Sequence, residues 1–283
     1  MKRAMMILVG LLLATAGFAQ QPAGKGQAQS GQAQPGAAQP AAQPQGKRPP
    51  QAKTQPEFDA YKAAAANQDP AALMKAADDF ATKFPDSELR VILYKTAMRG
   101  FQQANDGDNM IDAGRKVLKI DPDDPEALVG VAEVLAERTR DTDLDKDQRY
   151  DEALKLAQHA TETIDTDVAV PAGTPQEKID AYKGFLRSSA YSIMGTIQYN
   201  REKYADAEAM YRKSIEAYPS QPDPIAVLRL ALCLDKQNKY PEALKEANHA
   251  VELTQEGTPA GKMARQERDR LAQLTGSAPA PKQ

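Results

Sequence analysis

From Glu57 onward, the apolar residues of the chain recur every three or four positions, which is the period of an amphipathic helix. No stretch of any length shows the apolar and polar alternation of a strand. Turn signals rich in proline, glycine and aspartate interrupt the pattern and leave helices of about 12 to 16 residues. These signals stand at 69–70, 84–87, 106–109, 121–125, 174–175, 218–219 and 240–241. The pattern therefore predicts an all-helical domain.

One helical segment of the chain occurs twice. Residues 150–162 and 240–252 are identical at nine of thirteen positions. Both copies carry alanines at intervals of four and three, and such a narrow stripe lets a neighbouring helix approach closely. The alanines are Ala153, Ala157, Ala160, Ala243, Ala247 and Ala250. A weaker copy begins at Tyr204, 36 residues before the last one, and this period is typical of stacked helical repeats.

These residues resemble the tetratricopeptide repeat family, which joins a large residue, Leu-Gly and an aromatic in one helix to alanine, an aromatic and proline in the next. The clearest unit is 188–221, which matches through Tyr191, Met194, Gly195, Tyr204, Ala207, Tyr211 and Pro219. Further units match at 57–85, 91–122, 125–165 and 224–257, and the stretch 261–274 suits a solvent-facing cap. The resemblance implies a right-handed superhelical solenoid of four to five helix pairs with a C-terminal capping helix.

The two ends of the chain differ from this domain. Lys2 and Arg3 precede a short apolar run and small residues at 17 and 19, which is the pattern of a secretory signal cleaved after Ala19. Residues 20–56 consist almost entirely of Gln, Pro, Ala and Gly, so we expect a disordered tether. Residues 275–283 are predicted to form a disordered tail. The signal implies a periplasmic or secreted protein without a membrane span after cleavage.

An insertion after Asp165 ends in a long predicted helix. We interpret Thr174-Pro175-Gln176-Glu177 as a capping box with proline at the first helical position. The apolar side of the helix that follows predicts a length of about 25 residues, about three turns beyond its repeat partner. This overhang either packs across the preceding repeat or presents a surface to a partner. We favour packing, because Ile179, Tyr182 and Leu186 would otherwise be exposed.

A shorter insertion places oxygen donors at positions one, three, five, seven and twelve of a helix-loop-helix calcium loop. The donors are Asp141, Asp143, Asp145, Asp147 and Glu152. However, Lys146 takes the sixth position, where the sharp turn needs glycine. Glu152 is also explained by the repeat, since Glu242 has the same phase in the last unit. We therefore interpret the segment as a solvated acidic loop and keep calcium as the weaker alternative.

The sequence contains no recognisable catalytic motif. We find no nucleophile elbow, metalloprotease helix, Cys-x-x-Cys pair or phosphate loop in the helical domain. His159 and His249 lie in equivalent helices ninety residues apart, so they should not share one metal. Cys233 is the only cysteine and is predicted to be a small core residue. We expect no cofactor and no enzymatic activity, and an enzyme with an unrecognised motif stays the weakest alternative.

The functional prediction rests on helix surface. In the family that the chain resembles, the first helix of each pair lines a concave groove that binds another protein or peptide. The corresponding positions here are Lys95, Arg99, Gln102, Glu126, Glu133, Glu137, Ser192, Thr196, Tyr199, Asn200, Asp235 and Lys236. The net charge of −3 argues against nucleic acid as the main partner. The segment from 121 to 165, with fourteen acidic and five basic residues, favours a basic partner or serves solubility.

These observations predict a non-enzymatic exported scaffold that binds a protein or peptide through the concave face. An alternative is a cell-envelope assembly or maintenance factor whose arm, residues 20–56, contacts cell wall or membrane. Residues 83–87, Lys-Phe-Pro-Asp-Ser, resemble the repeats of outer-membrane barrel-assembly and Tol-Pal-associated proteins and motivate this alternative. The sequence does not identify the partner.

Overall fold

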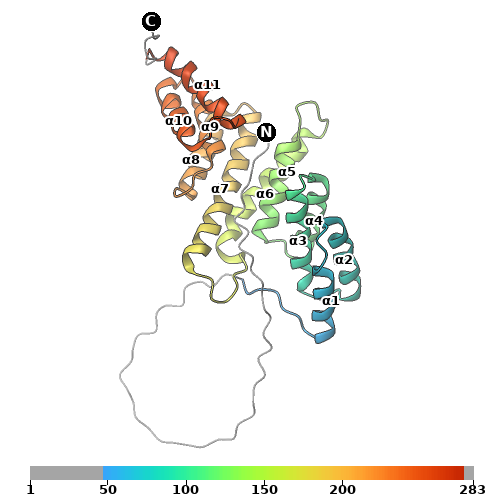
Figure 1. Cartoon of the computed structure of the whole chain (residues 1–283). Helices are drawn as coiled ribbons and strands as arrows, with labels where there is room; N and C mark the ends of the chain where they lie inside the picture. Colours follow the sequence, from blue (N-terminus) through green and yellow to red (C-terminus); the bar gives the residue numbers. More distant parts are fainter. Residues whose placement is uncertain (1–46, 277–283) are drawn as a thin grey trace, which may run out of the picture.

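The computed structural model describes residues 47–276, which form eleven helices and no strand. The helices are α1 (Gln55–Ala65), α2 (Pro70–Lys83), α3 (Leu89–Gln103), α4 (Gly107–Ile120), α5 (Pro125–Arg138), α6 (Lys146–Asp167), α7 (Gln176–Asn200), α8 (Tyr204–Ala217), α9 (Pro224–Lys236), α10 (Tyr240–Leu253) and α11 (Pro259–Leu274). Each helix packs against the next, so the chain is one row of helix pairs ending in α11 (Figure 1). The predicted all-helical solenoid is confirmed. The predicted signal peptide, most of the tether and the end of the tail lie outside the described residues.

The odd-numbered helices form the inner face of the row. Contacts join α1 to α3, α5 to α7, α7 to α9 and α9 to α11, whereas no two even-numbered helices come comparably close. Because the helices are nearer to one another on the odd-numbered side, the row is concave on that side. The first helices of the repeats therefore line the inner face, as the resemblance implied.

A recurring turn joins the helices of three pairs. Asn105, Glu202 and Asn238 have φ angles of 58°, 61° and 61°, and each stands two residues after an odd-numbered helix. In all three turns, the next amide donates to the carbonyl five residues earlier at 2.9 Å. Such a left-handed residue and backward bond are a common helix ending, which asparagine tolerates well. The same turn gives each of these pairs the same reversal of direction.

Small residues allow the helices to approach closely. All six alanines of the duplicated segment are completely buried, as is Tyr211 of α8. A β-carbon at Gly195 of α7 would lie 2.8 Å from the Tyr211 ring, so only glycine leaves room for that ring. Leu186, Ile193 and Ile197 of α7 are buried in a cluster with α5 and α6, so α7 shares a core with the preceding helix pair.

Helix α7 has the predicted length of 25 residues, but its start differs from the prediction. It begins at Gln176 without a side-chain cap, so the predicted capping box is wrong. The Thr174 hydroxyl donates instead to the Pro171 carbonyl at 2.8 Å, within the preceding loop. The overhang packs on the preceding repeat, since Leu186 is buried and α7 contacts α5 as well as α6, although Tyr182 keeps 37% of its surface exposed.

The predicted tether boundary at residue 56 also needs correction. Helix α1 begins at Gln55, and Thr54 forms a capping box with Glu57. The Glu57 carboxylate is buried and also accepts from the Ser87 hydroxyl at 2.5 Å. Residues 47–53, which we call the arm segment, lie against the helices and not apart from them. The composition of residues 47–53 did not predict this docking, because the segment is held by polar contacts and has no apolar stripe.

We expect Leu230→Ala to lower the free energy of unfolding by about 2–5 kcal/mol, because the residue lies in a packed core with Ala243 and Ala247. Chemical denaturation followed by circular dichroism measures the change. The control is Lys245→Ala, an exposed position in the same pair, which should cost less than about 0.5 kcal/mol. Equal losses for both variants would contradict the assigned helix phase.

Candidate functional site

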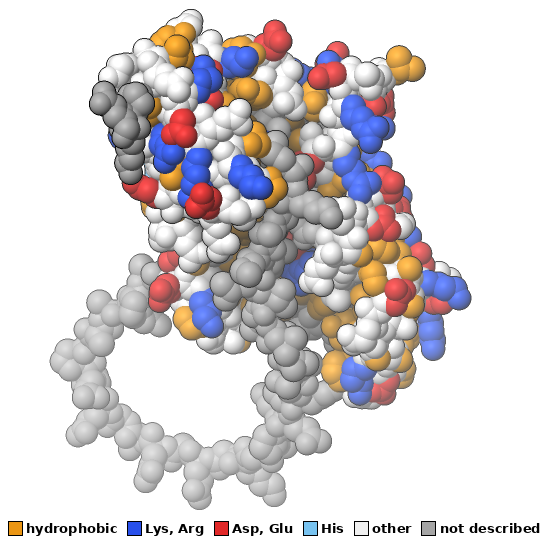
Figure 2. Space-filling view, turned by 45° about the horizontal axis from the view of Figure 1, so that its top comes forward, with side chains coloured by type: hydrophobic (Ala, Val, Ile, Leu, Met, Phe, Trp, Pro, Cys, Tyr) orange, Lys and Arg blue, Asp and Glu red, His pale blue; other side chains and the backbone are white. Residues whose placement is uncertain are grey.

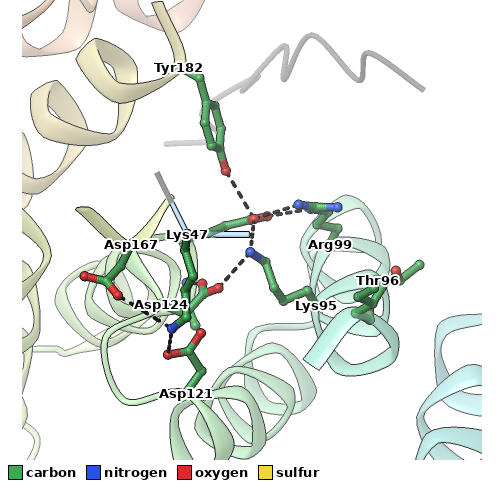
Figure 3. Close-up of polar contacts among 11 residues, drawn as sticks. Lys47, Lys95, Thr96, Arg99, Asp121, Asp124, Asp167 and Tyr182 are labelled. Carbon is green, nitrogen blue, oxygen red and sulfur yellow. Dashed lines mark hydrogen bonds and ion pairs between the residues drawn. The ribbon is translucent and has the colours of Figure 1, made fainter. Parts of the chain in front are cut away.

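Five side chains from three odd-numbered helices meet on the inner face, and we call them the central network. They are Lys95 and Arg99 of α3, Asp124 and Glu126 at the start of α5, and Tyr182 of α7. Figure 3 shows Lys95 and Arg99 of α3 and Tyr182 of α7 pointing towards one another from separate helices. Lys95 and Arg99 are four residues apart, so they lie on one side of α3. The overhang of α7 brings Tyr182 to them across the preceding repeat.

The carboxylate of Glu126 is the centre of this network. It lies 3.0 Å from the Lys95 ammonium and accepts two hydrogen bonds from Arg99, at 2.5 and 2.6 Å. The Tyr182 hydroxyl donates to it at 3.1 Å. Asp124 caps α5 by accepting from the Ala127 amide and also bonds Lys95 at 2.8 Å. An acidic residue in the first turn of a helix is further stabilised by the helix dipole.

The network keeps Glu126 and Lys95 charged and Tyr182 neutral. Burial by itself would raise the pKa of Glu126, but the positive charges of Lys95 and Arg99 outweigh it and lower the pKa to about 2. Burial would lower the pKa of Lys95, but the charges of Glu126 and Asp124 raise it. Burial, and then the charge of Glu126, raise the pKa of the Tyr182 phenol. At neutral pH, Lys95 and Arg99 are thus cations, Glu126 is an anion and Tyr182 is neutral.

The structure brings together three of the predicted groove residues and buries three others. Lys95, Arg99 and Glu126 pair with one another, so their charges are largely balanced within the chain. Glu133, Ser192 and Thr196 are buried, so they cannot line an accessible groove. Helix α5 packs against α4, α6 and α7, and this leaves few of its side chains accessible.

The other predicted groove residues lie apart along the row. Tyr199 packs edge-on against Tyr204 with ring centres 5.4 Å apart, and the Asn200 amide donates to the Tyr150 hydroxyl at 3.0 Å. Asp235 is covered by the capping helix, because Arg270 pairs with it at 2.5 Å. Gln102 is partly buried, whereas Glu137 and Lys236 are exposed. The predicted positions therefore do not form one continuous groove.

The weak calcium candidate does not assemble. Helix α6 already begins at Lys146, and the nearby cations bind the carboxylates. Asp145 pairs with Arg149 at 2.7 Å, and Glu152 pairs with Arg115 of α4 at 2.8 Å. Asp141 lies 3.5 Å from Lys146, while Asp143 accepts from the Arg140 amide and Asp147 lies within the helix. Within residues 47–276, no three His, Cys, Asp or Glu side chains are placed to hold a metal ion.

The histidines and the cysteine occupy structural positions. His159 bonds Asp123 at 2.7 Å, and His249 lies 3.8 Å from Glu246 in another repeat. Cys233 is fully buried, and that burial raises the pKa of its thiol to about 12. A thiol with so high a pKa is not an activated nucleophile at neutral pH. The residue packs as the small core side chain that the sequence predicted.

The visible surface carries charges of both signs. Figure 2 shows basic and acidic side chains interspersed, with no extended patch of one sign on that face. This distribution agrees with the small net charge of −3. Among residues 47–276, no helix is both long enough and apolar enough to cross a bilayer.

Beside the central network, the arm segment crosses the inner face, which sequence reasoning missed. The Lys47 ammonium lies 2.6 Å from Asp121 and 3.6 Å from Asp167. Figure 3 shows Lys47 between these two carboxylates. Arg48 makes two bonds to Glu88, at 2.6 and 2.8 Å. A cavity of about 150 Å³ lies between the arm segment and α3, next to Lys95. The sequence signal that could have indicated this contact was the basic pair Lys47-Arg48, because its partners Glu88, Asp121 and Asp167 all lie at helix ends.

Comparisons with known proteins place the chain in a fold class. No family model and no curated protein matches the sequence. The structure of PilF from Pseudomonas aeruginosa is similar, with a TM-score of 0.54 and 16% identity over 79% of this chain and 87% of that chain. The structure of PilW, described as a widely conserved type IV pilus biogenesis factor, has a TM-score of 0.50 and 17% identity over 80% and 88%.

Identities this low show the fold alone. The chain is a helical-repeat solenoid whose odd-numbered helices line its inner face. The stacked helix pairs have the architecture that the resemblance to tetratricopeptide repeats implied.

We expect Glu126→Gln to lower the free energy of unfolding by about 2 kcal/mol at pH 7, because Arg99 loses its carboxylate partner and Lys95 keeps only Asp124 in a mostly buried site. The folded pKa of Glu126 is depressed from the ordinary 4.5 to about 2, so the stabilisation is complete above about pH 4.5 and is lost as the pH falls towards 2. Urea unfolding of both proteins between pH 7 and 3 measures the difference. A difference that does not shrink on acidification would contradict the ion-pair account.

Proposed function

We propose that this chain is an exported, non-enzymatic scaffold that binds a segment of another protein on its inner face near α3. The observation that carries the proposal is the surface between α3, α5 and α7. There Arg99 keeps 46% of its side chain exposed although it is paired, beside a cavity lined by the arm segment. A concave surface with fixed charges and a partly apolar cavity is suited to a peptide segment.

The ordered charges support this role physically. Lys95 and Arg99 are held in place by Glu126, so few side-chain rotamers are lost when a partner binds. The predicted signal sequence supports export, and the wide acidic excess between 121 and 165 supports a basic partner. PilW is described as a biogenesis factor, but the similarity of this chain to it does not extend to a shared partner.

In the alternative role, the protein is a cell-envelope factor whose N-terminal arm, residues 20–56, contacts cell wall or membrane. The arm segment already contacts the helices, which leaves residues 20–46 for cell wall or membrane. Deleting residues 20–46 leaves the arm segment and α1 in place and therefore separates the two roles. Release of the protein from the envelope fraction upon this deletion would favour the alternative.

We expect the exported protein to begin at Gln20, because signal cleavage is predicted after Ala19. Fractionation of expressing cells followed by intact mass measurement checks this. A full-length chain retained in the cytoplasm would contradict the export part of the proposal.

A photo-crosslinking residue at Gln102 should capture a partner, because Gln102 lies one turn beyond Arg99 on the same side of α3. The same residue at the exposed Lys155 of α6, on an even-numbered helix, is the matched control. We expect a discrete adduct at position 102 and none at position 155. Identical adducts at both positions, or no adduct at position 102, would contradict the proposal that the partner binds on the inner face.

A further inference from the structure

The arm segment is an extended peptide docked on the inner face. In Figure 1 the light-blue chain runs from the loop between α6 and α7 to the start of α1. The Lys47 amide donates to the Thr166 carbonyl at 3.0 Å, and the Lys47 carbonyl accepts from the Val170 amide at 3.3 Å. Both main-chain groups of one residue are therefore held by the end of α6 and the loop that follows it, which fixes the position of an extended chain without reading its sequence.

The side chains of the arm segment supply the specificity. Lys47 lies between Asp121 and Asp167, and the next residue, Arg48, binds Glu88 through two parallel hydrogen bonds. Arg48, by donating these bonds, lowers the pKa of the Glu88 carboxyl. The planar guanidinium matches a carboxylate in a way that a lysine ammonium cannot. Two consecutive basic residues thus bind two separate acidic sites.

The residues that follow are suited to an extended conformation. Pro49 and Pro50 have fixed φ angles and lack amide hydrogens, so little conformational entropy is lost when they bind. Pro50 lines the cavity beside Val91 and Ile92 of α3. The Gln51 amide then donates to Glu88 at 3.3 Å, and the Lys53 ammonium donates to the Asp86 carbonyl at 2.9 Å.

The docking is weak enough to be reversible. The side chain of Arg48 is 64% exposed and that of Lys47 is 39% exposed, and ion pairs at such positions contribute little in water. The segment stays bound because α1 tethers it, which gives it a high effective concentration at the site. A separate segment with the same chemistry could replace it once the arm segment is released.

We propose that Glu88, Asp121 and Asp167 form an acidic docking site for an extended segment with two consecutive basic residues followed by proline, and that residues 47–50 occupy it in cis. This inference rests on the proposed function and specifies the chemistry of the partner. The described Lys-Arg-Pro-Pro sequence is the internal ligand, and a partner with such a segment binds by displacing it. The acidic excess of residues 121–165 favours the same basic ligand.

The test uses the full chain and a fluorescein-labelled peptide with the sequence of residues 46–53, followed by fluorescence anisotropy. Lys47→Glu with Arg48→Glu releases the arm segment by repulsion from the three carboxylates. We expect this variant to bind the peptide at least about tenfold more tightly than the wild type, in which the tethered segment competes. Adding Glu88→Gln and Asp121→Asn to the variant should abolish binding, and a peptide with alanine at both basic positions should not bind.

Lys155→Glu with Lys245→Glu is the matched control, because it makes the same charge change at exposed positions of even-numbered helices. We expect this control variant to bind the peptide with the same affinity as the wild type. Circular dichroism should show equal helix content for all variants. Equal peptide affinity in the released variant and the wild type would overturn the inference, as would equal binding of the alanine peptide. A concentration-dependent dimer of the wild type that is lost in the released variant would instead show that a second copy supplies the segment.

These outcomes are separable from those of the proposed function. If a partner crosslinks at position 102 but the peptide does not bind, the proposed scaffold function is supported and only the proposed basic docking segment is rejected. If the peptide binds but no adduct forms at position 102, partner binding on the inner face is rejected. The acidic site would then be a docking site for the chain's own residues 47–50 only.

Discussion

No helix pair of this chain can bury its apolar stripe alone, and the close stacking of pairs over small residues is the constraint on which the structure depends. Ala97, Ala113 and Ala132 are completely buried, as are the alanines of the duplicated segment. At these positions a larger side chain would separate the helices and leave a loosely packed interface. The row must also be closed at both ends. Helix α11 does this at one end with Leu271, which is completely buried.

The length of α7 determines how the inner face is divided. The overhang covers α5, so that the middle of the row is filled with side chains and not open as a groove. At the C-terminal end, Arg270 of α11 covers Asp235 of α9. The accessible inner face is thus concentrated near α3 and the arm segment. The surface available to a partner is consequently shorter than five repeats would suggest, and it lies next to the chain's own extended segment.

The sequence predicted those features that depend on local pattern. The duplicated segment, the alanine stripe and the turn signals were sufficient for the all-helical solenoid and for the length of α7. The site was predicted only in part, because the helical period shows which residues share a face but not which groups lie opposite. Lys95 and Arg99 were correctly placed on one face, yet their pairing with Glu126 depends on how α3 and α5 stack.

The remaining differences have similar causes. Thr196 was predicted to face the groove, but Arg229 of the next repeat and Tyr211 of its own pair both donate to it. The arm segment was assigned to a tether because it has no apolar stripe, while its actual partners are carboxylates far away in sequence. Such contacts join residues 40 and 74 positions apart, and no local pattern records them.

Amide hydrogen exchange at Val170 tests most directly the claim that the inner face holds an extended basic segment. This amide donates to the Lys47 carbonyl, although it lies in a loop outside any helix. The account predicts slow exchange at Val170 in the wild type and fast exchange, like that of a free loop, in the full chain carrying Lys47→Glu with Arg48→Glu. Fast exchange in the wild type, or equal protection in both proteins, would contradict it.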